Sequence, residues 1–331
     1  MMLDLFRLIR WKNLLMLFLV IWLLQHLVIS PILQVNYGVA PEYMISASAM
    51  LMLMLSMIFE AAGGYIVNDY FDIKIDAINR PDSQIVSKTV TRQQAMLYYQ
   101  ITTGIGVVCG IVAAYLLRNF TIGLVVVFVP GLLWFYSSTY KRVFLVGNLI
   151  VALTTALVPL LLAMANVSAL EKFVEPQILY QTSIPATIYK WMLAFALFAF
   201  MLTLIREIIK DIQDQVGDRE LECHTIPIVL GNTVAKIVVI CLMALTIGLL
   251  VLAYVKWIPY EIGWGSANMN YMLCFAVLWL VAMVVFVRSN RSADYGISAT
   301  MVKILMGWGL VYTLIFFIQI CQQVGQFIPI L

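Results

Sequence analysis

The chain has 331 residues, of which 63% are hydrophobic and 11% are charged, and its mean hydropathy is +0.97. Soluble domains carry roughly a quarter charged residues, so this composition excludes an ordinary soluble protein. The formal net charge is +3. It comes from loop residues on one side of the predicted membrane helices, so we expect no nucleic-acid partner.

Apolar stretches of about twenty residues recur along the chain, each long enough to cross a bilayer core of ~30 Å as a helix. They predict an all-α integral membrane protein of about nine transmembrane helices, bundled around a central cavity in a single polytopic domain over 1–331. The second and sixth helices are expected to run past the membrane. The expected spans are 14–33, 43–67, 94–117, 120–139, 146–166, 188–210, 233–256, 269–288 and 300–323.

The basic residues predict the orientation of these helices. Nine helices place the N-terminus and four loops on one side, and all but four of the 20 Lys and Arg lie on or beside that side. Basic loops stay in the cytoplasm, so we expect a cytoplasmic N-terminus in a multi-pass protein of the cell inner membrane. The four loops lie near 68–93, 140–146, 206–232 and 288–300.

The acidic residues gather in two stretches on that same side, which together hold ten of the 17 Asp and Glu. Each stretch begins where a long apolar helix is expected to leave the membrane. In the first, Asn68, Asp72 and Asp76 are spaced i, i+4, i+8. In the second, Asp211, Asp214 and Asp218 are spaced i, i+3, i+7, so each set shares one helix face.

Like charges on one helix face repel each other, and a bound divalent cation would remove that conflict. Oxygen ligands without His or Cys suit a hard ion such as Mg²⁺, which completes its shell with water and substrate phosphates. The two stretches therefore predict a site for a magnesium-chelated diphosphate. Their similar positions in the chain also suggest a pseudo-repeat of 1–140 and 145–290, followed by a ninth helix at 300–323.

These motifs resemble those of the UbiA superfamily of membrane prenyltransferases, which carry N-D-x-x-D-x-x-x-D and K-D-x-x-D-x-x-x-D signatures. Further runs extend the resemblance in the same order along the chain. They are Asn79-Arg80-Pro81-Asp82, Tyr136-Ser137, Lys141-Arg142, Gly147-Asn148 and Thr225 to Gly231.

The resemblance implies transfer of a prenyl group from a polyprenyl diphosphate to a small lipid or aromatic acceptor among the membrane lipids. It implies magnesium ligands at both motifs, with Asp72, Asp76, Lys210, Asp211 and Asp214 as the catalytic set. The implied metal ligands are Asn68, Asp69, Asp72, Asp76, Asp211, Asp214 and Asp218.

The acceptor is addressed by a finer resemblance. The run from Arg206 to Asp211 is similar to the digeranylgeranylglyceryl phosphate synthase branch, which implies geranylgeranylglyceryl phosphate as acceptor. The residues after Asp82 depart from the Arg-Pro-Ile-Pro-Ser-Gly that many relatives have there. Prenylation of 4-hydroxybenzoate or dihydroxynaphthoate for quinone synthesis, farnesylation of haem, and transport are the alternatives.

Five further residues are predicted to bind substrate. Arg80, Lys141 and Arg206 lie near the motifs and, with Lys210, are expected to share the charge of the leaving diphosphate. Glu60 lies inside the second helix on the Asn68 face, so it either lines the cavity or is a hydrogen-bonded core residue. Asn13 matches a position on the acceptor side in relatives, although an Asn near a helix start is also a common capping residue.

Overall fold

The computed structural model describes residues 2–79, 81–257 and 267–324. Within these ranges nine helices are long and apolar enough to cross a membrane, which confirms the all-α membrane fold. The first spans Trp11–Asn36 and begins with α2 (Trp11–Leu23). The others are α3 (Ala47–Phe71), α5 (Arg92–Leu117), α6 (Phe120–Ser138), α7 (Val146–Leu170), α9 (Ile184–Gln213), α11 (Ile226–Trp257), α12 (Ala267–Arg288) and α13 (Ser292–Val324).

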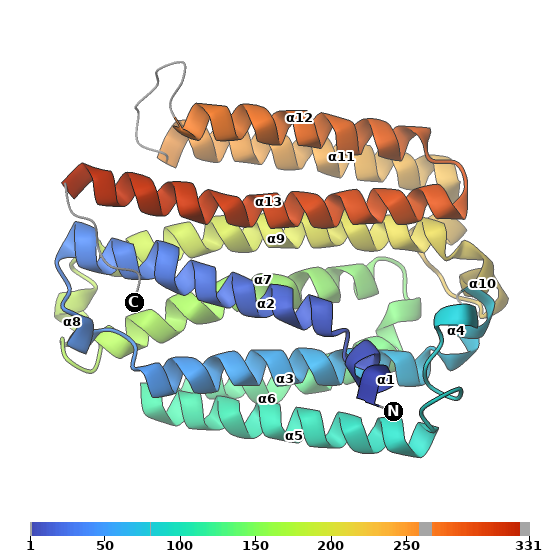
Figure 1. Ribbon diagram of the computed structural model, residues 1–331, viewed down its shortest axis with the longest axis horizontal. Coiled ribbons are helices and arrows are strands. Elements are labelled where there is room, and N and C mark those ends of the chain that lie inside the picture. The colour runs from blue at the N-terminus through green and yellow to red at the C-terminus, as the bar shows by residue number, and fades with distance from the viewer. Residues whose placement is uncertain (1, 80, 258–266, 325–331) are drawn as a thin grey trace.

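The long helices lie side by side along the long axis of the molecule (Figure 1). Two short helices, α4 (Ile73–Asn79) and α10 (Gln215–Glu220), lie together at one end of the bundle. The short α8 (Pro176–Leu179) lies at the opposite end, and α1 (Met2–Leu8) precedes α2. The helices α3 and α9 both run toward the end that holds α4 and α10.

Two helices begin seven or eight residues before their predicted starts. α11 begins at Ile226, and its first turn is separated from the rest by Gly231, whose φ of 83° is not helical. α13 begins at Ser292, where the Asp294 carboxylate accepts hydrogen bonds from the two backbone N–H groups of Asn290 and Arg291, at 3.1 and 2.9 Å. Polar helix starts of this kind carry no apolar signal, so hydropathy alone misses them.

Buried apolar side chains form two main clusters that share α7, α9 and α13. One lies among α2, α3, α5, α6, α7, α9 and α13, and the other among α7, α9, α11, α12 and α13. The outer faces are apolar as well, because Val108, Phe128 and Val277 are 61%, 67% and 60% exposed. A bundle that is apolar both inside and outside is suited to a lipid environment.

The first span leaves α-helical geometry in its second half, where it forms π-helical turns over Leu24–Ile29 and Ile32–Asn36. The wider turn carries the buried Gln25, which exchanges two hydrogen bonds with Asn166 of α7, at 3.0 and 2.7 Å. Each amide satisfies the other, as polar groups inside a membrane bundle require. This pair fixes the first span against α7.

Close packing between α3, α5 and α6 depends on glycine. Gly110 of α5 faces Ser56 of α3 and Val126 of α6 so closely that a Cβ atom at residue 110 would overlap both side chains. Small residues allow membrane helices to approach each other in this way. Gly104, on the same helix, has no atom within 4 Å of the corresponding position.

We therefore expect Gly110→Ala to lower the thermal stability of the protein in detergent, by about 1–3 kcal/mol of overpacking. Gly104→Ala is the matched control. It should leave the melting temperature unchanged or slightly raised, because alanine lowers the conformational entropy of the unfolded chain and meets no atom in the folded one. Equal melting temperatures for the two variants would contradict this account of the α3–α5–α6 contact.

Candidate active site

Each acidic stretch lies where a long helix breaks. α3 ends at Phe71 and α4 begins at Ile73, with Asp72 between them at φ −87° and ψ 2°. α9 and α10 are likewise separated by Asp214 at φ −96° and ψ 10°. Both long helices run beyond their predicted ends, but continuous helix through the motifs is wrong at these two aspartates.

The break preserves the nearest pair of the first motif. The Asn68 side chain donates a hydrogen bond to Asp72 Oδ2 at 2.7 Å, as expected for residues one turn apart. The Asp72 backbone N–H still bonds to the Asn68 carbonyl at 3.0 Å. The carboxylate of Asp72 is thereby held at the end of α3, and its residue is only 4% exposed.

One asparagine joins the two acidic stretches. Asn79, at the end of α4, donates from Nδ2 to the Asp214 carbonyl at 3.0 Å and accepts at Oδ1 from the Gly217 N–H at 2.9 Å. A Cβ atom at residue 217 would overlap the Asn79 side chain, so the contact requires glycine. The structure thus brings together two stretches that lie more than 130 residues apart in the sequence.

The carboxylates of the first motif are paired with cations from other parts of the chain. Arg10, just before α2, forms an ion pair with Asp69 at 2.7 Å. Lys141, in the turn between α6 and α7, forms an ion pair with Asp72. Burial lowers the pKa of both cations, but their carboxylate partners outweigh it and raise the pKa of each above its ordinary value.

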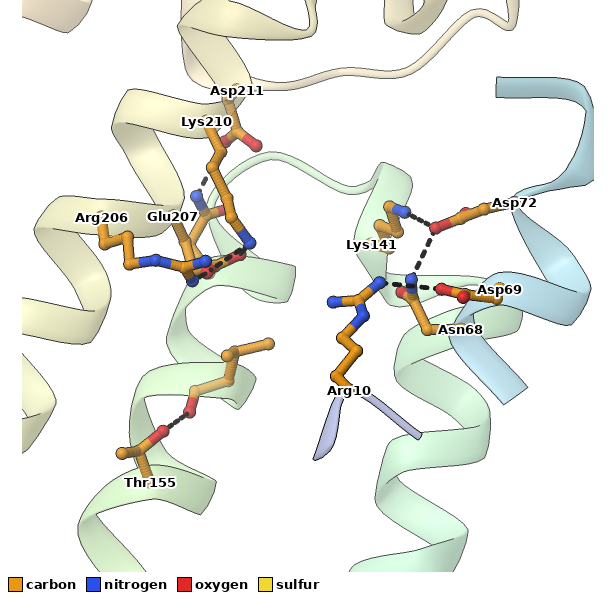
Figure 2. Close-up of polar contacts among 12 residues, drawn as sticks. Arg10, Asn68, Asp69, Asp72, Lys141, Thr155, Arg206, Glu207, Lys210 and Asp211 are labelled. Atoms are coloured by element: carbon orange, nitrogen blue, oxygen red, sulfur yellow. Dashed lines mark hydrogen bonds and ion pairs between the residues drawn. The ribbon is translucent and has the colours of Figure 1, made fainter. Parts of the chain in front are cut away.

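The second motif has a different set of partners. Asp211 accepts a hydrogen bond from Asn148 Nδ2 at 2.7 Å. Glu207, one turn before Asp211, lies between two cations, with Arg206 at 2.5 Å and Lys210 at 3.0 Å. Figure 2 shows the four labelled side chains of α9 opposite those of the first motif and its cations. The α9 side chains are Arg206, Glu207, Lys210 and Asp211, and the others are Arg10, Asn68, Asp69, Asp72 and Lys141. The two groups interact, because the charges of Arg10 and Glu207 act on each other.

The remaining predicted residues are distributed around this site. Asp76 and Asp214 are half-buried and Asp218 is buried, and all three take part in interactions with other groups. Arg80 lies outside the described residues.

The sequence allows two interpretations each for Glu60 and Asn13. Glu60 is buried in α3, accepts a hydrogen bond from Ser56 at 3.2 Å and packs against Gly106 of α5. Its contact with an acceptor stays a prediction. The capping role of Asn13 is wrong, because α2 begins at Trp11 after Arg10.

The donor atoms at the site suit a divalent cation that arrives with its substrate. Among the described residues, no group of three or more His, Cys, Asp and Glu lies close enough to hold a metal unaided. Oxygen donors at the two helix breaks fit Mg²⁺ that takes one or two carboxylates and fills its shell with phosphate oxygens. The residues therefore fit a magnesium diphosphate better than a permanent metal centre.

Four contributors to the site were missed as site residues from the sequence, namely Arg10, Asn79, Asn148 and Glu207. Each acts through a contact with another helix or loop or with a neighbouring cation, and local periodicity carries no such information. The sequence does offer one signal for such residues. Unpaired charge is costly near a membrane, so every buried ion is expected to have a partner.

Fold and site together define a multi-pass membrane protein whose polar chemistry is concentrated at one end of its bundle. The model of the UbiA prenyltransferase family matches residues 28–305, so the chain belongs to this family and is a prenyltransferase. The digeranylgeranylglyceryl phosphate synthase of Methanobrevibacter smithii is 30% identical over 244 residues, which cover 73% of this chain and 77% of that protein.

Solved structures show the same fold. One of digeranylgeranylglyceryl phosphate synthase matches with a TM-score of 0.59 at 21% identity, covering 96% of this chain and 99% of the other. A UbiA homologue from Archaeoglobus fulgidus bound to GPP and Mg²⁺ matches with a TM-score of 0.52 at 15% identity, covering 93% and 98%.

Removal of the Lys141 ammonium should destabilise the protein. Lys141→Gln leaves the buried Asp72 carboxylate without its cation, at a cost of about 3–5 kcal/mol. The pKa of Lys141 is raised above 10.5, so its contribution is complete below the unfolded value and lost only at higher pH. The difference in unfolding free energy between wild type and variant, measured in EDTA, should therefore stay constant from about pH 6 to about pH 9. A difference in unfolding free energy that decreases as the pH rises through this window would contradict the Lys141–Asp72 ion pair.

The Asn79 contact should matter for substrate binding as well as for stability. Asn79→Ala removes two hydrogen bonds, each worth about 1 kcal/mol, and separates α4 from α10. We expect weaker binding of a prenyl diphosphate in the presence of magnesium, measured by titration calorimetry. The exposed Asp82, in the turn after α4, offers a control, and Asp82→Asn should bind like wild type. Unchanged affinity in Asn79→Ala would show that the two motifs do not depend on this contact.

Proposed function

We propose that this chain transfers a prenyl group from a magnesium-bound polyprenyl diphosphate to geranylgeranylglyceryl phosphate, in the synthesis of ether lipids. The observation that carries the proposal is the meeting of two acidic helix ends at one end of an apolar bundle. The names of relatives at about 30% identity support this acceptor, and the Mg²⁺ and GPP bound to a homologue of the same fold support the donor.

The metal ligands are proposed to come from both motifs. Bound Mg²⁺ would neutralise the diphosphate oxygens and act as a Lewis acid toward the leaving group. Two motifs from different halves of the chain would then bind one diphosphate between them. The proposed ligands are Asn68, Asp69, Asp72, Asp76, Asp211, Asp214 and Asp218.

The reaction breaks the allylic C–O bond of the donor and joins the prenyl carbon to an acceptor hydroxyl oxygen, which loses its proton. Diphosphate leaves as an anion while positive charge develops on the prenyl carbon. Lys141 beside Asp72 and Lys210 beside Asp211 supply fixed positive charge near the leaving group, and Arg80 is proposed to do the same. The surrounding apolar bundle excludes water, which would otherwise capture the prenyl cation.

Position in the membrane follows from the same arrangement. We propose that the end with α4 and α10 faces the cytoplasm at the cell inner membrane, because the basic loops lie at that end. A water-soluble diphosphate head would then reach the motifs from the cytoplasm, while its prenyl chain and the acceptor's chain remain among the membrane helices. Asn13 and Glu60 are proposed to lie on the acceptor side.

The proposal predicts magnesium-dependent formation of a diether lipid by purified protein in detergent. Radiolabelled geranylgeranyl diphosphate and geranylgeranylglyceryl phosphate would be the substrates, with products identified by mass. EDTA should abolish the product, and Asp72→Asn or Asp214→Asn should reduce the rate by about a hundredfold or more, as the loss of electrostatic groups does in other enzymes. Asp82→Asn is again the control. A product formed only with 4-hydroxybenzoate or dihydroxynaphthoate would overturn the acceptor.

A further inference from the structure

A lysine lies inside the last membrane helix, beside the arginine that precedes the second motif. α9 and α13 pack antiparallel, and two contacts fix their register. At the acidic end, Gly296 lies against the Gln213 side chain, and deeper in the bundle Gly309 lies against Phe198. Seven residues below the first contact, α9 carries Arg206 and α13 carries Lys303.

Seven residues are two helical turns, so each of these cations projects from the same face as the contact residue above it. Arg206 and Lys303 therefore lie on the same side of the α9–α13 pair at the same depth, about 10 Å from Gln213 and Gly296. The Arg206 side chain is half-buried, and Lys303 is exposed. Their charges act on each other, and the charges of Arg10 and Glu207 also act on Lys303.

Arg206, Lys303, Lys210 and Glu207 form a charged cluster that carries more positive than negative charge. Arg206 and Lys210 share Glu207 as their carboxylate, and no ion pair to Lys303 is found in the described part of the chain. The Nε atom of Arg206 is buried and has no hydrogen-bond partner. Cations within a membrane span are costly unless they are paired or bind a ligand, and a guanidinium with a free N–H favours an anion with several oxygens.

We propose that Arg206 and Lys303 bind the phosphate group of the lipid acceptor. The inference rests on the proposed transfer to a phosphorylated lipid and names the residues that select it. In this proposal Lys303, which lies outside both acidic motifs, determines the specificity for a phosphorylated acceptor. Arg206 thereby has a separate task from Lys141, which pairs with Asp72, and from Lys210, which directly precedes Asp211 in the sequence.

Depth distinguishes this phosphate from the diphosphate of the donor. Arg206 lies about 7 Å along α9 from Asp211 and about 12 Å from Asp214, on the side away from the acidic end. In a glyceryl phosphate the reacting hydroxyl and the phosphate are on neighbouring carbons. A phosphate at Arg206 and Lys303 would therefore leave the hydroxyl close to the prenyl carbon, whose diphosphate is at the motifs above.

The test compares geranylgeranylglyceryl phosphate with its dephosphorylated alcohol as acceptors. In Lys303→Gln we expect the KM for the phosphorylated acceptor to rise about tenfold or more, as for a lost hydrogen bond to a charged group. The KM for the donor should not change, and the preference over the alcohol should fall by the same factor. Lys303→Arg should restore both.

A second readout is independent of turnover. In EDTA, the phosphorylated acceptor should raise the melting temperature of the wild type but not that of Lys303→Gln, whose own melting temperature shows that it is folded. Lys190→Gln is the matched control, because this exposed lysine lies on α9 at the opposite end of the membrane span. It should behave like wild type in both assays.

The outcomes separate the inference from the function on which it rests. A raised KM for the donor would assign the cluster to the diphosphate and overturn the inference. An unchanged preference for the phosphorylated acceptor in Lys303→Gln would overturn it too, with the proposed function intact. Wild-type protein that prenylates neither glyceryl lipid would instead overturn the proposed function.

Discussion

Charge is costly inside an apolar bundle, and in this chain that cost decides how the polar end is built. The buried and half-buried carboxylates near the ends of α3 and α9 are held by groups from elsewhere in the chain. Arg10 holds Asp69, Lys141 holds Asp72 and Asn148 holds Asp211. Each of these contacts joins a long helix to another segment. The interactions that make the acidic groups tolerable therefore also set the relative positions of the helices.

The breaks in α3 and α9 also shape the polar end of the bundle. Because α3 and α9 both break at an aspartate, the chain turns there and places α4 and α10 across the end of the bundle. A straight helix would have carried the later carboxylates beyond the end of the bundle. The breaks instead bring the two motifs together at one end of the bundle, above the apolar helices.

Much of the fold was predictable from the sequence, because hydropathy over about twenty residues reports directly on membrane helices. The nine spans and the Asn68–Asp72 pair depend on such local patterns, and they are confirmed. The contact between Asn79 and Gly217 and the π-helical turn that presents Gln25 to Asn166 were not predictable. They join residues 138 and 141 positions apart, and no periodic pattern within one helix records a partner in another.

The contact between Asn79 and Gly217 also has a consequence for how this sequence can change over time. The amide of Asn79 occupies the space that a side chain at residue 217 would need. A larger residue is therefore tolerated at 217 only after residue 79 has become smaller, and neither change is neutral when it comes first. The two positions are expected to vary together or not at all. Sequence change in one half of the chain is thereby linked to sequence change in the other.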